Sequence, residues 1–114
     1  MAEWGAVRIG AMQEHGLSAC AKHFPGKGHA PLDAHLELPV IDSDWGEMKK
    51  THLPPFWRAM EEGVDLIMTS HPIYSKLDPD LPVTFSKRIV REYLRGELGY
   101  RGVICSDDLE MHAL

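Results

Sequence analysis

Apolar positions along the chain follow two alternating patterns. Three short runs are almost wholly apolar, and each predicts a strand that is buried on both faces. The segments between them place apolar residues three or four positions apart, which is the spacing of a helix with one buried face. The predicted strands are 17–22, 64–69 and 103–105, and the predicted helices are 3–15, a short helix after Asp44, 56–62 and a helix after Ser86.

Residues that favour helix ends stand at the limits of these helices. Asp42, Ser43 and Asp44 offer an N-cap for the short helix, with Glu47 able to close a capping box from Asp44, and Ser86 is placed to cap the helix that follows it. Gly16 and Gly63 come where the first and third helices should stop. The helix after Ser86 is amphipathic, with a predicted buried face made by Ile89, Val90, Tyr93 and Leu94.

Apolar strands separated by helices predict an α/β fold, with a parallel sheet built from βαβ crossovers. Long loops follow the first two strands, and in parallel α/β proteins the loops at the carboxyl ends of strands carry the chemistry. We therefore expect functional side chains at three clusters, which are Lys22-His23, Ser70-His71 and Ser106-Asp107-Asp108.

Composition narrows the possible partners. The chain has 114 residues and a net charge of −5, from 12 Lys and Arg against 17 Asp and Glu. With no basic run, this charge argues against nucleic acid or an anionic membrane surface as the main partner. No apolar run approaches the ~20 residues that span a bilayer, and residues 1–10 do not resemble a signal peptide.

Cys20 and Cys105 lie in apolar segments, so we expect two buried free thiols.

An Asp-x-His pair stands in the first long loop, which is rich in glycine and proline. Asp33 could hold the imidazole of His35 in one tautomer and raise its basicity. The spacing alone favours the simpler alternative, in which Asp33 forms a turn and His35 is a solvated loop residue. Lys22, at the end of an apolar strand, would point into the mouth of the sheet or serve as that strand's polar end.

Two adjacent aspartates end the third strand. Neighbouring residues in an extended chain point to opposite sides, so Asp107 and Asp108 cannot both face one site. One of them should face the site while the other caps the next helix, or both should cap the helix that begins near Leu109.

Three long segments together resemble a known enzyme family, the β-N-acetylhexosaminidase branch of glycoside hydrolase family 3. They are KHFPGKGHAPLDAHLELP (22–39), LPPFWRAMEEGVDLIMTSHPIY (53–74) and LPVTFSKRIVREYLRGELGYRGVICSDDLEM (81–111). The family pattern K-H-F-P-G-H-G has Lys27 here in place of its second histidine, and D-S-H has Ala34 in place of serine. The pattern S-D-D-L-x-M is intact at 106–111.

The resemblance implies a (β/α)₈ TIM barrel, of which residues 1–114 would form about three consecutive βα units, with no complete second domain. It implies a retaining exo-β-N-acetylglucosaminidase without metal or cofactor. Asp107 would be the nucleophile and His35 the acid/base, supported by Asp33, while Lys22 and His23 would bind the sugar. Lys22 would also favour the ionised form of Asp107.

The implied substrate is a carbohydrate that contains N-acetylglucosamine, from peptidoglycan fragments or chitin oligosaccharides. We expect a cytoplasmic monomer when full length, and a secreted or cell-surface location stays open. Three alternatives remain: a phosphorylase that uses phosphate as acceptor, an inactive sugar-binding fragment, and a metal-dependent hydrolase that uses His23, Asp33, His35 and Asp107. Because a barrel needs ~200 or more residues, the isolated chain should be unstable or inactive.

Overall fold

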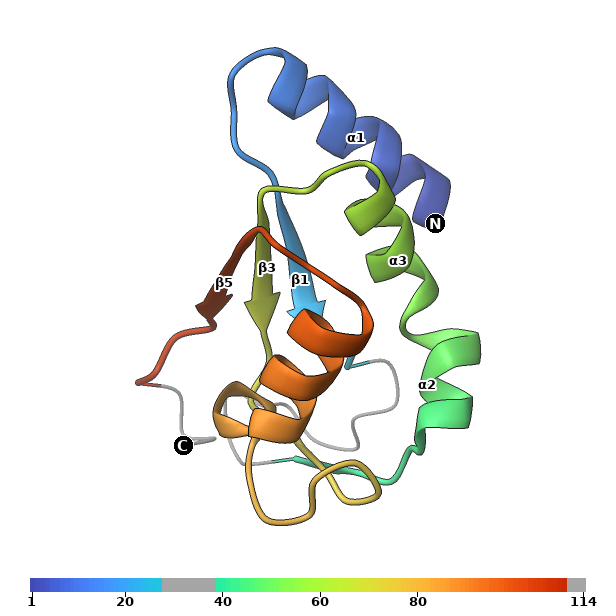
Figure 1. Cartoon of the computed structure of the whole chain (residues 1–114), viewed down its shortest axis with the longest axis vertical. Helices are drawn as coiled ribbons and strands as arrows, with labels where there is room; N and C mark the ends of the chain where they lie inside the picture. Colours follow the sequence, from blue (N-terminus) through green and yellow to red (C-terminus); the bar gives the residue numbers. More distant parts are fainter. Residues whose placement is uncertain (28–38, 111–114) are drawn as a thin grey trace.

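The computed structural model describes residues 1–27 and 39–110, and it contains both helices and strands (Figure 1). In chain order the elements are α1 (Ala2–Glu14), β1 (Cys20–Phe24), β2 (Val40–Ile41), α2 (Trp45–Thr51), α3 (Pro54–Glu61), β3 (Leu66–Thr69), β4 (Ile73–Tyr74), the short helix η1 (Val83–Phe85), the helix η2 (Lys87–Glu97) and β5 (Val103–Ser106).

A three-stranded parallel sheet with the order β1-β3-β5 organises these elements. Cys20 is opposite Leu66, and Leu66 is opposite Val103, so the strands start at the same level. Helices lie between consecutive strands of the sheet, as Figure 1 shows. The prediction of an α/β fold with parallel strands joined by helices is confirmed. The first strand starts at Cys20 and runs on to Phe24, slightly later than predicted.

The core lies between the sheet and the helices that follow β1. Phe24 and Ile67 are fully buried, and the ring of Phe24 meets that of Phe56 on α3 edge to face, with 5.2 Å between the centroids. Helix α1 packs along α3, and Arg58 of α3 reaches Glu3 of α1 at 3.1 Å. This packing joins the helix that precedes β1 to the helix that precedes β3.

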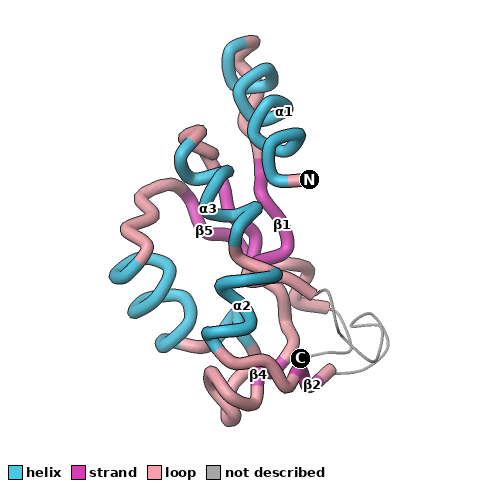
Figure 2. Tube along the Cα trace, turned by 90° about the vertical axis from the view of Figure 1, so that its right-hand side faces the viewer, coloured by secondary structure: helices cyan, strands magenta, loops and turns pink. Residues whose placement is uncertain are grey.

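A second, very small parallel sheet joins β2 to β4, with Val40 opposite Ile73 and Ile41 opposite Tyr74. Figure 2 shows the two strands together beside α2. The sequence does not predict them, because two residues are too few to show a hydrophobic period. The buried hydroxyl of Tyr74 donates to the carbonyl of Gly26, so this region is also tied to the segment after β1.

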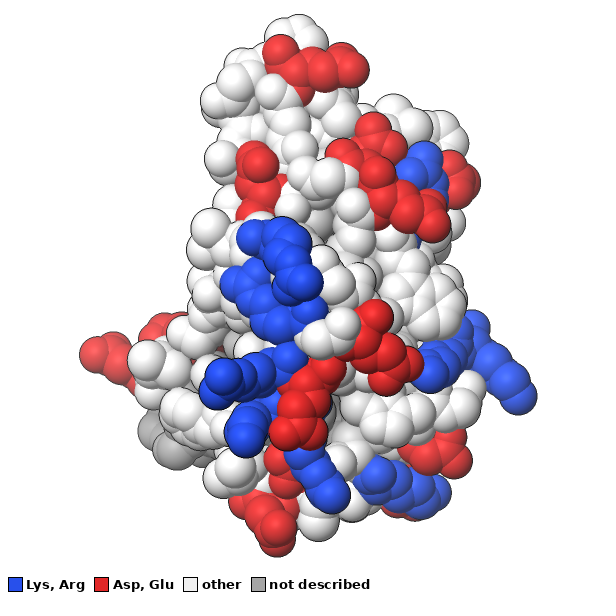
Figure 3. All heavy atoms as spheres, viewed as in Figure 1, with Lys and Arg blue, Asp and Glu red and all other residues white. Residues whose placement is uncertain are grey.

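The predicted helix caps are present. The backbone N–H of Glu47 donates to Asp44 Oδ1 at 2.9 Å, and that of Ile89 donates to Ser86 Oγ at 3.1 Å. On η2 the side chains of Ile89, Tyr93 and Leu94 are buried, as the amphipathic pattern predicts, whereas Val90 is only half-buried. Lysine, arginine and glutamate side chains alternate on the outer face of η2 (Figure 3), which is therefore its solvated side.

Both cysteines are free, as expected, but the prediction that they are buried is wrong. Cys20 is exposed and Cys105 is half-buried. They lie on β1 and β5, the outer strands of the three-stranded sheet, where each strand has a partner on one side only within the described residues. Among those residues, no helix is both long and apolar enough to cross a membrane.

Replacing Ser86 tests the cap of η2. In Ser86→Ala, the N–H of Ile89 loses its acceptor and the buried Asp78 carboxylate loses a donor that lies 2.6 Å from its Oδ2. A lost cap and an unsatisfied buried group together should lower the free energy of unfolding by roughly 2–4 kcal/mol, measured by urea denaturation of the full-length protein. The exposed cap Asp44→Ala should lower it by only about 1 kcal/mol. Equal losses would contradict the role of the Ser86–Asp78 pair.

Candidate active site

Charged side chains from opposite edges of the main sheet meet beyond the carboxyl ends of its strands. His23 lies on β1, Lys27 three residues after that strand, and Asp107 directly after β5. His23 Nε2 is 3.4 Å from Asp107 Oδ2, and Lys27 Nζ is 3.6 Å from the same oxygen. Parallel pairing through β3 brings these residues together although 80 or more positions separate His23 and Lys27 from Asp107 in the chain.

Asp107 is held by its backbone and by its carboxylate. Its N–H donates to the carbonyl of Thr69 at 3.1 Å, which extends the β3–β5 pairing past the end of the strand. Its Oδ1 accepts the N–H of Asp108 at 3.0 Å, and its Oδ2 faces His23 and Lys27. The side chain is 17% exposed, so the carboxylate is largely enclosed yet reachable from solvent.

The two adjacent aspartates have different partners, as one of the two sequence hypotheses requires. While Asp107 faces the cations, Asp108 Oδ1 accepts the N–H of Glu110 at 2.9 Å. Asp108 thus caps a turn that begins at Leu109.

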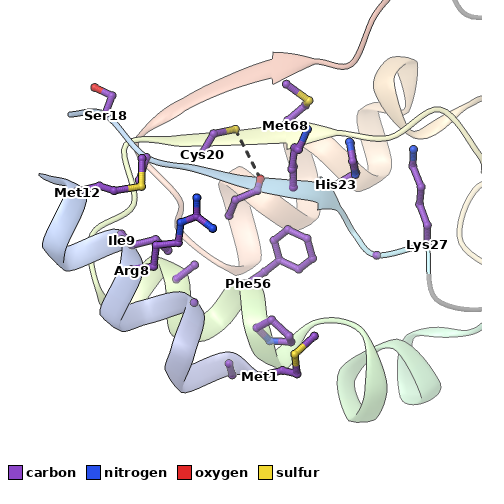
Figure 4. A pocket seen from close by; sticks show the side chains of 18 residues that line it. Met1, Arg8, Ile9, Met12, Ser18, Cys20, His23, Lys27, Phe56 and Met68 are labelled. Atoms are coloured by element: carbon purple, nitrogen blue, oxygen red, sulfur yellow. Dashed lines mark hydrogen bonds between the residues drawn. The ribbon is translucent and has the colours of Figure 1, made fainter.

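His23 and Phe24 have different surroundings at the end of β1. Phe24 is fully buried in the core, whereas His23 is half-buried and its ring reaches Asp107. Figure 4 shows His23 and Lys27 together on the side of β1 opposite Phe56. The Lys22–His23 and Phe24–Pro25 peptide bonds are both cis.

Lys22 is exposed on β1, beside a groove of about 800 Å³ between α1, β1 and α3 that His23 and Lys27 also line (Figure 4). Among the ion pairs of the described residues, the partners of Asp107 are His23 and Lys27, and Lys22 is not one of them. The lysine that favours the ionised carboxylate in this structure is therefore Lys27, in place of the expected Lys22.

Asp33 and His35 lie outside the described residues, and so does any contact between them. The backbone before and after residues 28–38 is hydrogen-bonded to the same strand, β4. Gly26 O accepts the Tyr74 hydroxyl, and Pro39 O accepts the N–H of Ile73 at 3.0 Å. Burial raises the pKa of Tyr74, so its hydroxyl stays protonated and remains a donor.

For two residues near Asp107 the sequence predicts no individual role. Lys27 is noted there only as a departure from the family pattern, and its pairing with Asp107 depends on a contact across the sheet that spacing does not reveal. His71 belongs to one of the three clusters expected at strand ends, with no role of its own assigned to it. Its side chain is fully buried, with Nε2 2.8 Å from the carbonyl oxygen of Asp108.

The electrostatic environment of Asp107 favours its ionised form. Burial by itself raises the pKa of the carboxyl, but the N–H of Asp108 and the charges of His23 and Lys27 oppose it, and the resulting pKa lies below the ordinary value. In the part of the chain that the structure describes, no three His, Cys, Asp or Glu side chains are grouped as a metal site would need.

Comparison with known proteins identifies relatives along the whole chain. The family model for the glycosyl hydrolase family 3 N terminal domain matches residues 2–114. A protein named Beta-hexosaminidase from Tolumonas auensis is 44% identical over 104 residues, which are 90% of this chain and 31% of the relative. A Beta-hexosaminidase from Hydrogenovibrio crunogenus is 39% identical over 109 residues, 96% of this chain and 30% of the relative.

A solved structure gives the same result. The glycoside hydrolase family 3 beta-N-acetylglucosaminidase from Paenibacillus sp. str. FPU-7 superposes with a TM-score of 0.94 at 39% identity, covering 98% of this chain and 22% of that one. The chain thus spans about 30% of the length of the curated relatives it matches.

Removing the charge of Lys27 tests the electrostatics of Asp107. In Lys27→Met the carboxylate loses a cation 3.6 Å away, so the pKa of Asp107 should rise and its ionisation should be lost at a higher pH. The measurement is a ¹³C NMR titration of the aspartate carboxyl carbons. Lys49→Met, which removes the partner of Glu97, is the matched control and should leave the pKa of Asp107 unchanged. A larger shift in Lys22→Met than in Lys27→Met would contradict this assignment.

Proposed function

The chain belongs to the glycosyl hydrolase family 3 N-terminal domain family, and on this premise we propose that the full-length protein is a retaining β-N-acetylglucosaminidase. The observation that carries the proposal is the enclosed Asp107 carboxylate, paired with His23 and Lys27 at the carboxyl edge of the sheet. Because the chain spans about 30% of its curated relatives, the activity is proposed for the full-length protein.

The three βα units form an arc of the family's (β/α)₈ barrel, whose chemistry takes place at the carboxyl ends of the strands. In this arrangement Asp107 attacks the anomeric carbon of a terminal N-acetylglucosamine, and the bond to the leaving oxygen breaks. The product of this step is a covalent glycosyl-enzyme. A pKa below the ordinary value keeps Asp107 ionised, and therefore nucleophilic, at neutral pH.

The departing oxygen needs a proton, which we assign to His35 with support from Asp33. The same imidazole then takes a proton from water as the water attacks the glycosyl-enzyme, so the configuration is retained after two inversions. Lys22 and His23 are proposed to bind sugar hydroxyls. The proposed substrates are peptidoglycan-derived or chitin-type saccharides that end in N-acetylglucosamine.

A second candidate function is phosphorolysis, in which phosphate replaces water as the acceptor. Two groups that can carry positive charge, His23 and Lys27, lie within 3.6 Å of Asp107. They would reduce the repulsion that an anionic acceptor meets close to a carboxylate. Formation of N-acetylglucosamine 1-phosphate in phosphate buffer would distinguish this reaction from hydrolysis.

The nucleophile is tested by Asp107→Ala in the full-length protein. Turnover of p-nitrophenyl N-acetylglucosaminide should be abolished, because no other group would form the glycosyl-enzyme. The matched control is Asp42→Ala, which removes an exposed carboxylate paired with Lys76 at 3.2 Å and should leave turnover unchanged. Full activity of folded Asp107→Ala would refute the proposed role.

The acid/base role is tested by His35→Ala with aryl glycosides of different leaving groups. A good leaving group needs little protonation, so glycosylation should slow much less for activated aryl substrates than for poor leaving groups. The readout is the slope of log kcat/KM against leaving-group pKa, which should be steeper in the variant than in the original protein. Equal loss with every leaving group would argue against this role for His35.

A further inference from the structure

A buried histidine supports the segment that carries Asp107. The side chain of His71, two residues after β3, has no exposed surface. Its Nε2 lies 2.8 Å from the carbonyl oxygen of Asp108, and its Nδ1 lies 2.8 Å from Thr84 Oγ1 on η1. Since a carbonyl oxygen only accepts, Nε2 carries a proton and donates it to Asp108.

Thr84 fixes the other side of the imidazole. Its hydroxyl is also 3.0 Å from the carbonyl oxygen of Ser70 and 3.0 Å from Thr69 Oγ1. Thr69 and Ser70 are buried, so these polar groups are partnered inside the protein. The ring of His71 is thus held by Asp108 on one side and by Thr84 of η1 on the other, and Thr84 is itself bonded to the carboxyl end of β3.

The hydrogen bond from His71 completes the support of Asp107 on its carboxyl-terminal side. On the other side, the N–H of Asp107 is bound to the carbonyl of Thr69 at 3.1 Å. Between these two anchors, the N–H of Asp108 donates to Asp107 Oδ1. The N–H and the carbonyl of Asp108 belong to neighbouring peptide planes joined at its Cα, so a bond that fixes the carbonyl limits how far the N–H can turn.

We propose that His71 is a positioning residue that orients the Asp107 carboxylate by holding the carbonyl of Asp108. The effect on turnover rests on the proposed function of Asp107, whereas the effect on the backbone does not. A displacement of the nucleophile by about 1 Å can slow a reaction about 100-fold, so the loss of this bond should be visible in the chemical step.

Two amide substitutions separate the two nitrogens of His71. The side-chain amide of glutamine reaches the place of Nε2 and can donate to Asp108, whereas that of asparagine reaches only the place of Nδ1. In the full-length protein, His71→Asn should slow single-turnover release of p-nitrophenol about 10- to 100-fold, with KM nearly unchanged. His71→Gln should stay within about 3-fold of the original rate constant if the donor to Asp108 is what matters.

A second readout does not depend on activity. Hydrogen exchange of the Asp107 and Asp108 amides should be faster in His71→Asn than in His71→Gln, while the amides of α1 exchange alike in both. Equal single-turnover rates and equal exchange in the two variants would overturn the positioning role. Should Asp107→Ala retain turnover, the proposed function would fail, and the exchange measurement would still decide the role of His71.

Thr84 supplies a second pair of variants in case His71→Asn does not fold. Thr84→Val removes the hydroxyl that holds Nδ1, and Thr84→Ser keeps it. The valine variant should show a slower single turnover and faster exchange at Asp107, and the serine variant should restore both. Two variants that behave like the original protein would overturn the proposal.

Discussion

Parallel pairing of β1, β3 and β5 is the constraint on which the rest of this structure depends. Because all three strands run the same way from the same level, their carboxyl ends reach one edge together. The pairing continues beyond the strands, through the bond from the N–H of Ser70 to the carbonyl of Phe24 and that from Asp107 to Thr69. His23, His71 and Asp107 are therefore neighbours because of backbone geometry, and their side chains need only local support.

That support balances the cost of enclosing a carboxylate. Partial burial by itself would raise the pKa of Asp107. The N–H of Asp108 and the side chains of His23 and Lys27 more than compensate, which is why the pKa of Asp107 falls below its ordinary value. The same contacts fix the direction of the carboxylate, so one set of interactions sets both its charge and its orientation.

The sequence predicts those parts of the fold that depend on residues close together in the chain, which are the strands and the helix caps. Short apolar runs locate the three main strands, and the caps at Asp44 and Ser86 follow from their positions before helices. The two-residue strands β2 and β4 are too short for a period, and their pairing is set by tertiary contacts. The Lys27–Asp107 pair and the bond from His71 to Asp108 join residues far apart in the chain, so no spacing rule could predict them.

The outer strands show why the site belongs to a larger sheet. Val103 on β5 is 57% exposed and Cys20 on β1 is exposed, whereas Ile67 on the central strand is fully buried. In the family's closed barrel, further strands pair with both outer edges and cover such positions. The groove between α1, β1 and α3 runs along one of these edges and has a largely apolar lining, so it suits a neighbouring strand and its side chains better than a sugar. A sugar instead needs the polar edge of the sheet where Asp107, His23 and Lys27 meet. The remaining strands and loops of a closed barrel would surround that edge and form the sides of a sugar pocket.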